Sequence, residues 1–323
     1  MADISIKIDF LQKIFGECSV DGNTFFCREK SIPIRNGVIR FTPDESYSSG
    51  NFSKLREKHA QLQLDSVNGT TDRAQTILRR SGWTPEFFKG KTVLECGCGA
   101  GADTEVLLSF GARVVSVDLA GLDVCSNNLK EHPNLTLIQA SIMDLPFLKH
   151  SFDIVWCHRV IMHTPDPEAT LNHILSFVKE EGAAFVHSYA RSWQQMLSWK
   201  YVMRPFTKRL PSEQLYRDVE RWAPKLFRLT NKLRRVHPEW LGKLLFSLAY
   251  HLVPIRNYRF EKKFEGKSDD FILEYAIHDT FDCLSPAYDK PLSKSTMMKA
   301  AQRHLLKPWE VTHQGANLLR SKV

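Results

Sequence analysis

The sequence predicts an α/β fold: a doubly wound, mostly parallel seven-stranded sheet with a small N-terminal ribbon and a helical insertion. Two observations lead to this prediction. Between residues 91 and 190, short apolar runs of strand length alternate with helical segments, which is typical of a parallel sheet covered on both faces. From about residue 191 a basic, aromatic stretch of helical character interrupts the alternation, which resumes after about residue 265.

The first region, residues 1–45, is short and rich in turns. Asn36-Gly37 lies between two apolar runs and predicts a two-residue hairpin turn. Residues 46–90 are predicted to form a helical lid or linker. Five residues there follow an approximate helical spacing: Phe52, Leu55, His59, Leu62 and Leu64. Thr71-Asp72 is expected to cap the next helix, which runs to about Arg80.

Residues 91–190 are predicted to be the core of the fold. The expected strands are Thr92–Cys96, Arg113–Val117, Leu135–Gln139, Phe152–Cys157 and Ala183–Ser188. Helical segments near 103–110, 121–131 and 167–179 separate them.

The remaining chain is predicted to form a cap and the end of the sheet. Residues 191–265 are interpreted as a helical insertion that covers the substrate site, and residues 266–323 as the completion of the sheet. The expected elements of this last part are strands at Phe271–Ile277, Trp309–His313 and Ala316–Arg320 and a helix near Ser293–Leu306.

Composition indicates a soluble globular protein, and its positive charge suits an acidic partner without identifying one. The chain has 323 residues, 43% of them hydrophobic, and a formal net charge of +8. This charge suits a phosphorylated or carboxylated substrate, a nucleic acid or an anionic membrane. The longest apolar stretch, Leu244–Pro254, is too short to span a bilayer, so no transmembrane segment is expected. It is interpreted as a buried core helix, with an interfacial helix and peripheral membrane contact as the alternative.

The beginning of the chain and the cysteines indicate a cytoplasmic protein. Residues 1–10 contain alternating charges and no apolar run of signal-peptide length. The seven cysteines are scattered and odd in number, which argues against a disulfide framework and favours a reducing compartment.

A glycine-rich loop follows the first core strand, in Val93-Leu-Glu-Cys-Gly-Cys-Gly-Ala-Gly101. Gly97, Gly99 and Gly101 let the backbone turn sharply and approach a ligand, while the start of the next helix offers unpaired N–H groups. A tight structural turn would also need glycine. The spacing Gly97-x-Gly99-x-x-Ala102 also meets the dinucleotide pattern, so the loop alone leaves two cofactor classes open.

The second core strand ends in an acid, Asp118. Because the carboxyl ends of parallel strands meet at one edge of a sheet, Asp118 is expected beside the glycine loop. A carboxylate there can accept hydrogen bonds from both ribose hydroxyls of an adenosine cofactor. Asp118 is therefore the predicted ribose ligand, although it could also cap the helix that starts after Gly121.

Together these motifs resemble the class I methyltransferases, a Rossmann-like family that uses S-adenosyl-L-methionine. The resemblance spans roughly residues 90–190 and continues through the runs at 139–147, 151–158 and 160–166. It implies that Glu95 faces the methionine end of the cofactor and that the loop needs no phosphate-binding role. The other cofactor-binding residues that it implies around the loop and the second strand are Gly97, Cys98, Gly99, Gly101, Asp118 and Leu119.

The sequence departs from the family where adenine would be bound. Relatives place an acid at the position of Ser141, which can still accept one hydrogen bond from the adenine amino group. The backbone at Ile142 is expected to contact the adenine edge, and Asp144 is a less favoured substitute for the missing acid.

Two segments outside the core resemble a narrower bacterial subgroup of these enzymes. The N-terminal stretch 32–41, with 63–69, resembles the zinc-ribbon-like segment of that subgroup, but this chain offers only Cys18 and Cys27 as thiol ligands. Two thiolates cannot complete a tetrahedral zinc site, so a degenerate ribbon without metal is expected. The run 274–288 matches the subgroup's D-T-x-D-x-x-S-P-x-Y motif, which borders the acceptor pocket in relatives; a turn with capping acids is an equal alternative.

A hydroxyl acceptor needs a general base, and histidine suits this role near neutral pH. His163 is the first candidate, because the loop after the fourth core strand carries catalytic groups in many relatives. His158 is the second, with a cofactor contact as its alternative role. The further catalytic candidates are His278 and Asp279 as a reserve pair and Tyr288, and His187 is the fourth histidine expected near this edge. No carboxylate cluster suggests a metal.

The insertion adds cations interleaved with aromatic residues. The cations of the insertion that are candidates for binding the substrate are Arg204, Lys208, Arg209, Arg217, Arg221, Arg228, Lys232, Arg234 and Arg235. They could hold a phosphate or carboxylate, while a solvated helix face is equally consistent with the pattern.

The favoured function is methyl transfer from S-adenosyl-L-methionine to a hydroxyl of a small molecule or glycan, with an anionic sugar of a bacterial surface polysaccharide as one acceptor. The charge and the ribbon keep a tRNA methyltransferase as the second hypothesis, which predicts binding that weakens steeply with salt. A non-catalytic binding module and a nicotinamide dehydrogenase are the remaining alternatives.

Overall fold

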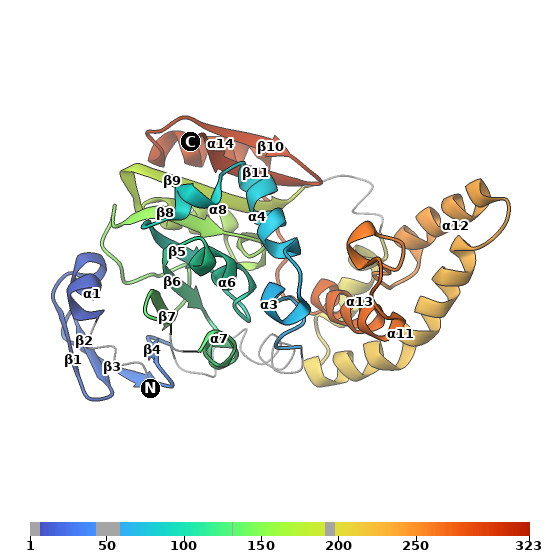
Figure 1. The fold of residues 1–323 in the computed structure, drawn as a ribbon, viewed down its shortest axis with the longest axis horizontal. Coiled ribbons are helices and arrows are strands. Elements are labelled where there is room, and N and C mark those ends of the chain that lie inside the picture. The colour runs from blue at the N-terminus through green and yellow to red at the C-terminus, as the bar shows by residue number, and fades with distance from the viewer. Residues whose placement is uncertain (1–6, 43–58, 131, 191–197) are drawn as a thin grey trace. The chain divides into compact units, whose positions relative to one another are not determined.

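The structure is a computed structural model that describes residues 7–42, 59–130, 132–190 and 198–323. The chain divides into two compact units, which we call the sheet unit, Met1–Ala190 with Tyr288–Val323, and the helical unit, Arg191–Ala287. Both are visible in Figure 1. The helical unit extends beyond the predicted end of the insertion at 265.

Seven strands of the sheet unit form a doubly wound sheet. They are β5 (Thr92–Cys96), β6 (Arg113–Asp118), β7 (Leu135–Gln139), β8 (Phe152–Cys157), β9 (Val178–Tyr189), β10 (Trp309–His313) and β11 (Ala316–Ser321). Their order is β7-β6-β5-β8-β9-β11-β10, parallel except that β11 runs antiparallel to β9 and β10. The strand order reverses between β5 and β8, and ligands of such sheets bind outside the carboxyl ends of the strands at this reversal.

Four N-terminal strands extend this sheet, so the predicted number of seven is corrected to eleven. They are β1 (Cys18–Asp21), β2 (Thr24–Cys27), β3 (Lys30–Arg35) and β4 (Val38–Arg40). β4 pairs in parallel with β7 and satisfies backbone groups that an edge strand would leave unpaired. The hairpin predicted at Asn36-Gly37 is confirmed, since both residues have positive φ, 53° and 72°, between β3 and β4.

Cys18 and Cys27 are opposite each other in the register of β1 and β2, and both are buried. Burial raises the pKa of the Cys18 thiol to about 11. The zinc-ribbon character of this segment stays a prediction.

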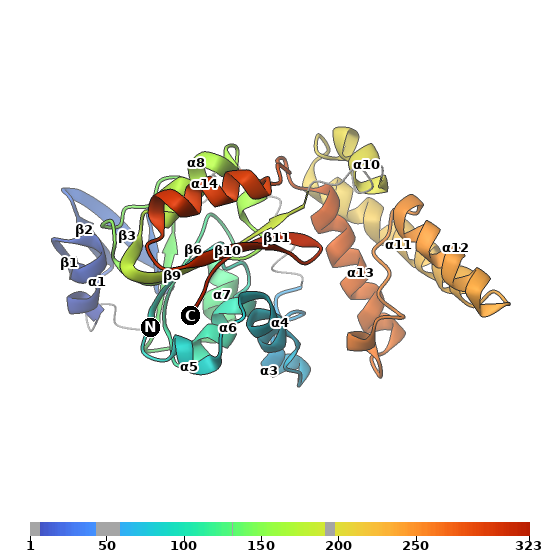
Figure 2. The ribbon, with the colours of Figure 1, turned by 90° about the horizontal axis from the view of Figure 1, so that it is seen from above.

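Helices cover both faces of the sheet (Figure 2). One face carries α4 (Asp72–Ser81), α6 (Ala102–Ser109) and α7 (Leu122–Leu129), and the other carries α8 (Pro167–Leu175) and α14 (Lys294–His304). The shorter helices are α1 (Ile8–Phe15), α3 (Asp65–Asn68), α5 (Pro85–Phe88) and the 3₁₀ turn η2 (Ile161–His163). Successive residues of β5 point to opposite faces, so Val93 joins one core cluster and Leu94 the other.

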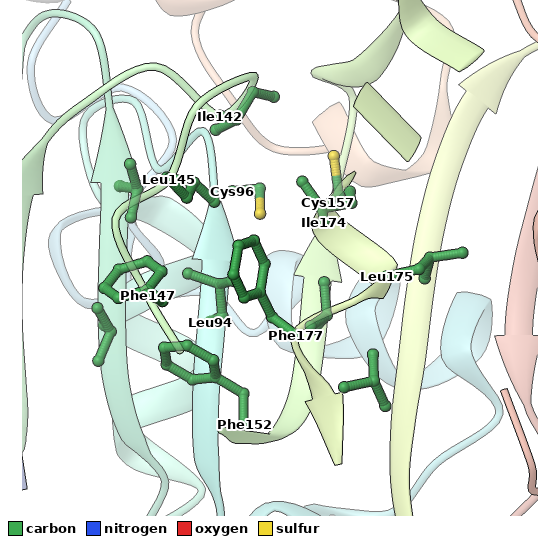
Figure 3. Close-up of a cluster of buried hydrophobic side chains, with 14 of the residues drawn as sticks. Leu94, Cys96, Ile142, Leu145, Phe147, Phe152, Cys157, Ile174, Leu175 and Phe177 are labelled. Carbon is green, nitrogen blue, oxygen red and sulfur yellow. The ribbon is translucent and has the colours of Figure 1, made fainter. Parts of the chain in front are cut away.

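Figure 3 shows part of the core on the α8 side, where Leu94 and Phe152 pack with Phe147, Phe177 and Ile174. Phe147 is the centre of the ring contacts, 5.0 Å from Phe152 and 5.9 Å from Phe177 between ring centroids. This apolar layer packs against β5 and β8 on the α8 face of the sheet and holds the two strands, and therefore their carboxyl ends, in place.

The predicted helical linker is described only in part. Phe52 and Leu55 lie outside the described residues, and His59 and Leu62 lie in turns. The helix predicted after Thr71-Asp72 is confirmed as α4, although the Thr71 side chain makes no capping hydrogen bond.

The helical unit contains α10 (Trp199–Thr207), α11 (Ser212–Arg234), α12 (Glu239–Leu252), the 3₁₀ turn η3 (Lys262–Phe264) and α13 (Asp269–Leu284). The strand predicted at Phe271–Ile277 is wrong, because these residues lie inside α13. The Ser268 hydroxyl accepts a hydrogen bond from the Phe271 amide, and two acids stand in the first turn, which are start signals of a helix.

The prediction that Leu244–Pro254 is a buried core helix is also wrong. The segment is helical within α12, but Leu244 and Leu248 are each 49% exposed. In the described part of the chain no helix is both long and apolar enough to cross a bilayer.

Candidate active site

The glycine loop connects β5 to α6 at the carboxyl edge of the sheet. The amides of Gly97 and Cys98 both donate to the Val117 carbonyl, at 2.7 and 3.3 Å, and the Gly101 amide donates to the Cys98 carbonyl. The Gly99 amide donates to the Asp118 carboxylate at 2.9 Å. These donors are used within the protein, so the loop does not form the open row of N–H groups that cradles a pyrophosphate.

Glycine is required at both ends of this loop. Gly97 has φ +83°, and a Cβ there would lie 2.3 Å from a methyl group of Val160. Gly101 has φ +94°, and a Cβ there would lie 2.9 Å from Leu129. The backbone of the loop therefore packs directly against its neighbours, which a side chain would prevent.

Asp118 links the loop to the end of β6. One carboxylate oxygen accepts from the Gly99 amide, and the other accepts from the Ala120 amide at 3.3 Å. The residue is buried, at 9% exposure. Backbone contacts thus orient the carboxylate that the sequence predicted as the ribose ligand, and they hold it beside the glycine loop as expected.

Glu95 is buried behind the loop rather than open at the edge. Its Oε2 accepts hydrogen bonds from the hydroxyls of Thr104 and Ser116, at 2.6 and 2.7 Å. Burial raises the pKa of Glu95 to about 7, with Asp103 adding to the rise. Its predicted contact with the methionine end of a cofactor is not part of what the structure describes and stays a prediction.

The residues predicted near adenine and around the second strand occupy the neighbouring loops. The Ser141 hydroxyl accepts from the Met143 amide at 3.2 Å, which leaves its proton able to donate. Ile142 is buried, and the Leu119 carbonyl accepts from the Gln139 side chain at 3.3 Å. The Cys98 side chain is buried too, so its contribution to ligand binding would be made by its backbone.

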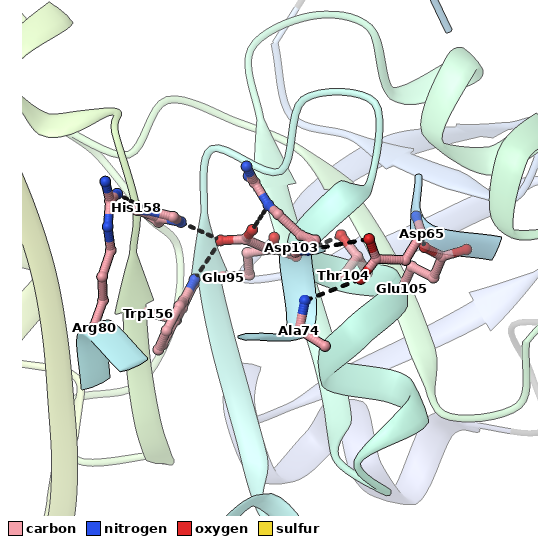
Figure 4. A network of polar contacts seen from close by, with 10 residues as sticks. Asp65, Ala74, Arg80, Glu95, Asp103, Thr104, Glu105, Trp156 and His158 are labelled. Atoms are coloured by element: carbon pink, nitrogen blue, oxygen red, sulfur yellow. Dashed lines mark hydrogen bonds and ion pairs between the residues drawn. The ribbon is translucent and has the colours of Figure 1, made fainter. Parts of the chain in front are cut away.

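A polar network around Asp103 lies at the same edge and was not predicted from the sequence (Figure 4). Asp103 Oδ2 accepts from Trp156 Nε1 at 2.8 Å and from His158 Nδ1 at 2.7 Å, and Oδ1 accepts from Arg73. Burial alone would raise the pKa of Asp103, but the charge of Arg73 and the hydrogen bonds from His158 and Trp156 hold it well below its usual value. Asp103 is therefore an ionised, fully paired carboxylate.

The helix that carries Arg73 is fixed from the opposite side. The Asp65 carboxylate accepts from the amides of Arg73 and Ala74 in the first turn of α4, at 3.0 Å each. The Glu105 carboxylate in turn accepts from the Asp65 amide at 2.9 Å (Figure 4). In the sequence, Asp103 is an acid in the first turn of a helix, a position where an acid can serve simply to stabilise the helix terminus.

His158 lies between the carboxylate of Asp103 and the guanidinium of Arg80, and both of its ring nitrogens are hydrogen-bonded. Since its Nδ1 donates to Asp103, its Nε2 is the acceptor of the 2.7 Å bond from Arg80. Burial lowers the pKa of His158 to about 4. This geometry makes His158 a positioning group, and it argues against His158 as the general base.

His163 is held in the tautomer that a general base needs. Its Nδ1 is 3.0 Å from the Tyr288 carbonyl, which can only accept, so the proton is on Nδ1 and the lone pair is on Nε2. The ring lies 5.8 Å from that of Tyr189. Tyr288 therefore contributes its backbone carbonyl to His163, a role that the sequence did not predict.

His187 on β9 completes a row of rings along this edge. Its centroid lies 5.3 Å from His158 and 5.9 Å from Tyr189. Burial holds the pKa of His187 well below its usual value, with His158, Arg80 and Arg159 adding to the effect. The structure brings His158, His163 and His187 together at one edge, as the sequence predicted.

His278 and Asp279 belong to α13 of the helical unit, where Asp279 accepts from the hydroxyl of Tyr258 and lies 3.4 Å from His278. Arg204, one of the cations assigned to an anionic substrate, is buried and donates to the carbonyls of Cys283 and Pro286, at 3.1 and 2.7 Å. Arg204 thus has a structural partner on each side within its own unit.

Known proteins that resemble this chain include methyltransferases. Residues 94–186 match the family model described as a methyltransferase domain. Ubiquinone biosynthesis O-methyltransferase of Coxiella burnetii (strain Dugway 5J108-111) is 31% identical over 113 residues, which cover 34% of this chain and 48% of that protein. The protein of the same name from Glaesserella parasuis serovar 5 is 31% identical over 133 residues, 37% of this chain and 56% of that protein.

The chain therefore spans about half the length of the curated relatives that it matches. Among solved structures, an S-adenosylmethionine-dependent methyltransferase from Mesorhizobium loti has 17% sequence identity and a TM-score of 0.33, covering 40% of this chain and 57% of that one. For residues 94–186 the resemblance to the methyltransferases drawn from the sequence is confirmed.

Proposed function

We propose that this protein, whose residues 94–186 match a methyltransferase domain, transfers the methyl group of S-adenosyl-L-methionine to a hydroxyl of a small molecule. The observation that carries the proposal is the pairing of the glycine loop with Asp118. The loop amides are engaged with Val117, Cys98 and Asp118, so the loop suits an uncharged ribose rather than a pyrophosphate. This argues against the dinucleotide alternative.

The residues present fit an adenosine cofactor. The Asp118 carboxylate is oriented beside the glycine loop by the amides of Gly99 and Ala120, and a carboxylate at this place can accept from ribose hydroxyls. Gly97 and Gly101 let the loop pack against Val160 and Leu129, and the Gly99 amide joins it to Asp118. Ser141 can donate to an adenine ring nitrogen, and Glu95 remains the proposed group at the methionine end.

The bound cofactor supplies an electrophilic methyl carbon on a sulfonium, and alignment of the acceptor with it is the main requirement. We assign His163 the role of general base. With the methyl group supplied by the cofactor, Nε2 of His163 would take the proton that the acceptor hydroxyl loses. The Tyr288 carbonyl keeps the other ring nitrogen protonated and stabilises the imidazolium that forms.

Cations at the same edge favour an anionic acceptor. Arg80 is half-buried on α4, and burial together with Arg159, Arg79 and Arg73 lowers its pKa to about 10. Several like charges gathered near the buried carboxylate of Asp103 provide an attractive potential for a carboxylate or phosphate. The names of the curated relatives support oxygen as the acceptor atom, and an anionic sugar remains within this class.

The cofactor assignment is tested by isothermal titration calorimetry with S-adenosyl-L-homocysteine and with NAD⁺. We expect binding of the first and none of the second. Asp118→Asn keeps the shape and an acceptor for the Gly99 amide but loses the charge, and should weaken binding about 10- to 100-fold. Glu181→Gln, whose side chain is 89% exposed near the start of β9, is the matched control and should bind as wild type does. Equal affinity of Asp118→Asn and wild type would contradict the assignment.

The base is tested by the release of S-adenosyl-L-homocysteine over a panel of phenols and hydroxy acids. His163→Gln should lower kcat about 10²- to 10⁴-fold while cofactor affinity stays unchanged. A variant that retains the wild-type kcat would remove His163 from the proposal.

A further inference from the structure

Positive charge is concentrated in the helical unit. Residues 191–287 contain 18 Lys and Arg against 11 Asp and Glu, and therefore hold +7 of the chain's net charge of +8. The sheet unit, with more than twice as many residues, is close to neutral. A binding surface for an anionic partner is therefore expected on the helical unit.

The charge follows one face of α11. Six exposed cations recur at intervals of three or four residues along this helix and its C-cap: Arg217, Arg221, Lys225, Arg228, Lys232 and Arg235. The buried residues follow the opposite face, Leu215, Val219, Ala223, Phe227 and Thr230. Because a helix has 3.6 residues per turn, the cations form a continuous stripe facing away from the packed side of the helix.

The next helix carries an exposed apolar stripe. Trp240, Leu244, Leu248 and Leu252 are spaced by four residues on α12 and are 66%, 49%, 49% and 70% exposed. The packed side of α12 uses other residues, Gly242 and Ala249. A Cβ on Gly242 would lie 2.5 Å from the Arg234 carbonyl, so α12 approaches the end of α11 closely with this side. The stripe therefore lies on the side of α12 that faces away from the end of α11. Figure 1 shows the two helices as a hairpin.

Exposed large apolar side chains are concentrated in this unit. Of the sixteen such side chains in the described part of the chain, nine lie between Val202 and Phe260. An apolar stripe of this kind costs free energy in water, and on soluble proteins it marks a surface that is covered by a partner.

We propose that the α11–α12 hairpin docks on the surface of an anionic phospholipid bilayer. The Trp240 to Leu252 stripe would lie in the interface between headgroups and acyl chains, and the α11 cations would contact lipid phosphates. Charge complementarity and the apolar stripe together favour this occupant, because RNA would use the cations but leave the leucines in water, and an apolar protein surface would leave the cations without counter-charges. The proposal is independent of methyl transfer.

The first experiment is flotation of the full chain with vesicles of phosphatidylcholine, with and without phosphatidylglycerol. Wild type should float with the anionic vesicles and not with the neutral ones. Leu244→Gln/Leu248→Gln should weaken binding at least tenfold. The matched control is Met298→Gln/Leu306→Gln, which removes apolar side chains that are 42% and 75% exposed on the sheet unit and should bind as wild type does.

The second experiment reverses charge. Arg221→Glu/Lys225→Glu should weaken binding to anionic vesicles at least tenfold at low salt and reduce the salt dependence, whereas Lys294→Glu/Lys299→Glu on α14 should not. Trp240 provides a local probe, since its emission should shift to the blue with anionic vesicles, and Trp240→Phe should remove this shift.

Three outcomes would overturn the proposal. Equal flotation with neutral vesicles would exclude recognition of anionic lipid. A dimer in solution that Leu244→Gln/Leu248→Gln converts to a monomer, with no flotation, would assign the stripe to a second copy of this chain. Salt-dependent binding of RNA that the leucine substitutions leave unchanged, again without flotation, would assign the cations to nucleic acid.

Discussion

The carboxyl edge of the sheet and the α11–α12 hairpin both gather cations but hold them differently. At the edge, Arg73 and Arg80 each contact a buried partner, Asp103 and His158, and the four groups form one network. On α11 the cations are exposed and lie opposite the packed side of the helix. The difference indicates that the edge is organised before a ligand arrives, whereas the hairpin is suited to a partner whose charges need no exact position.

The largest effect that this comparison predicts is at Asp103. Asp103→Asn removes the charge that compensates Arg73 and should lower the free energy of unfolding by about 3 to 5 kcal/mol. Since the pKa of Asp103 is held below its usual value, this carboxylate stays ionised above about pH 4, and the loss should be equal at pH 5 and pH 7. Urea denaturation measures it, with Glu181→Gln as a control expected to change stability by less than about 0.5 kcal/mol. A similarly small loss in Asp103→Asn would mean that the network is not essential.

The same network predicts a pH dependence of stability. The pKa of His158 is lowered to about 4, so between pH 4 and about 6.5 the unfolded chain binds a proton that the native protein does not. Stability should therefore fall as the pH falls through this window, by about 3 kcal/mol from His158, with His187 adding to the slope. His158→Gln should flatten the curve measured by urea denaturation. A wild-type curve that is already flat between pH 4.5 and 6.5 would contradict a buried neutral His158.

The glycine loop gives a steric test of the edge. Gly97→Ala places a Cβ against Val160 at a positive φ and should cost about 2 to 4 kcal/mol in thermal or urea unfolding and abolish cofactor binding. Val160→Ala should restore part of the loss in the double variant, because it removes the two nearest methyl carbons. If the double variant were no more stable than Gly97→Ala, backbone strain and not the contact with Val160 would account for the cost.

The edge was predictable to the extent that it depends on local sequence. The loop at 97–101, Asp118 and the hairpin at Asn36-Gly37 are encoded in turn chemistry and strand endings, and the structure has them where they were predicted. The Asp103 network was not predictable, because Arg73, Asp103 and His158 are far apart in sequence and become neighbours only through packing of α4 and α6 against β8. The Tyr288 carbonyl on His163 depends on a contact across 125 residues for the same reason.

In the helical unit, the pattern of apolar residues predicted the secondary structure of one segment and the burial of another wrongly. The Phe271–Ile277 run is apolar except for Glu274 and has the length of a strand, but the helix start at Ser268 places it inside α13. Leu244–Pro254 was correctly helical, but an apolar pattern does not distinguish a core helix from one with an exposed stripe, since both need the same side chains.

The smallest expected effect separates exposed from buried cations within the helical unit. Arg221→Gln/Lys225→Gln on α11 should change the free energy of unfolding by less than about 0.5 kcal/mol, because both side chains are exposed and surface charges contribute little. Arg204→Gln in the same unit should cost about 2 to 3 kcal/mol, because Arg204 is buried and its loss leaves two carbonyls without a donor. Urea denaturation of both variants makes the comparison. A large loss in the α11 variant would show that its stripe packs within the protein, and would remove it as a free surface for an anionic partner.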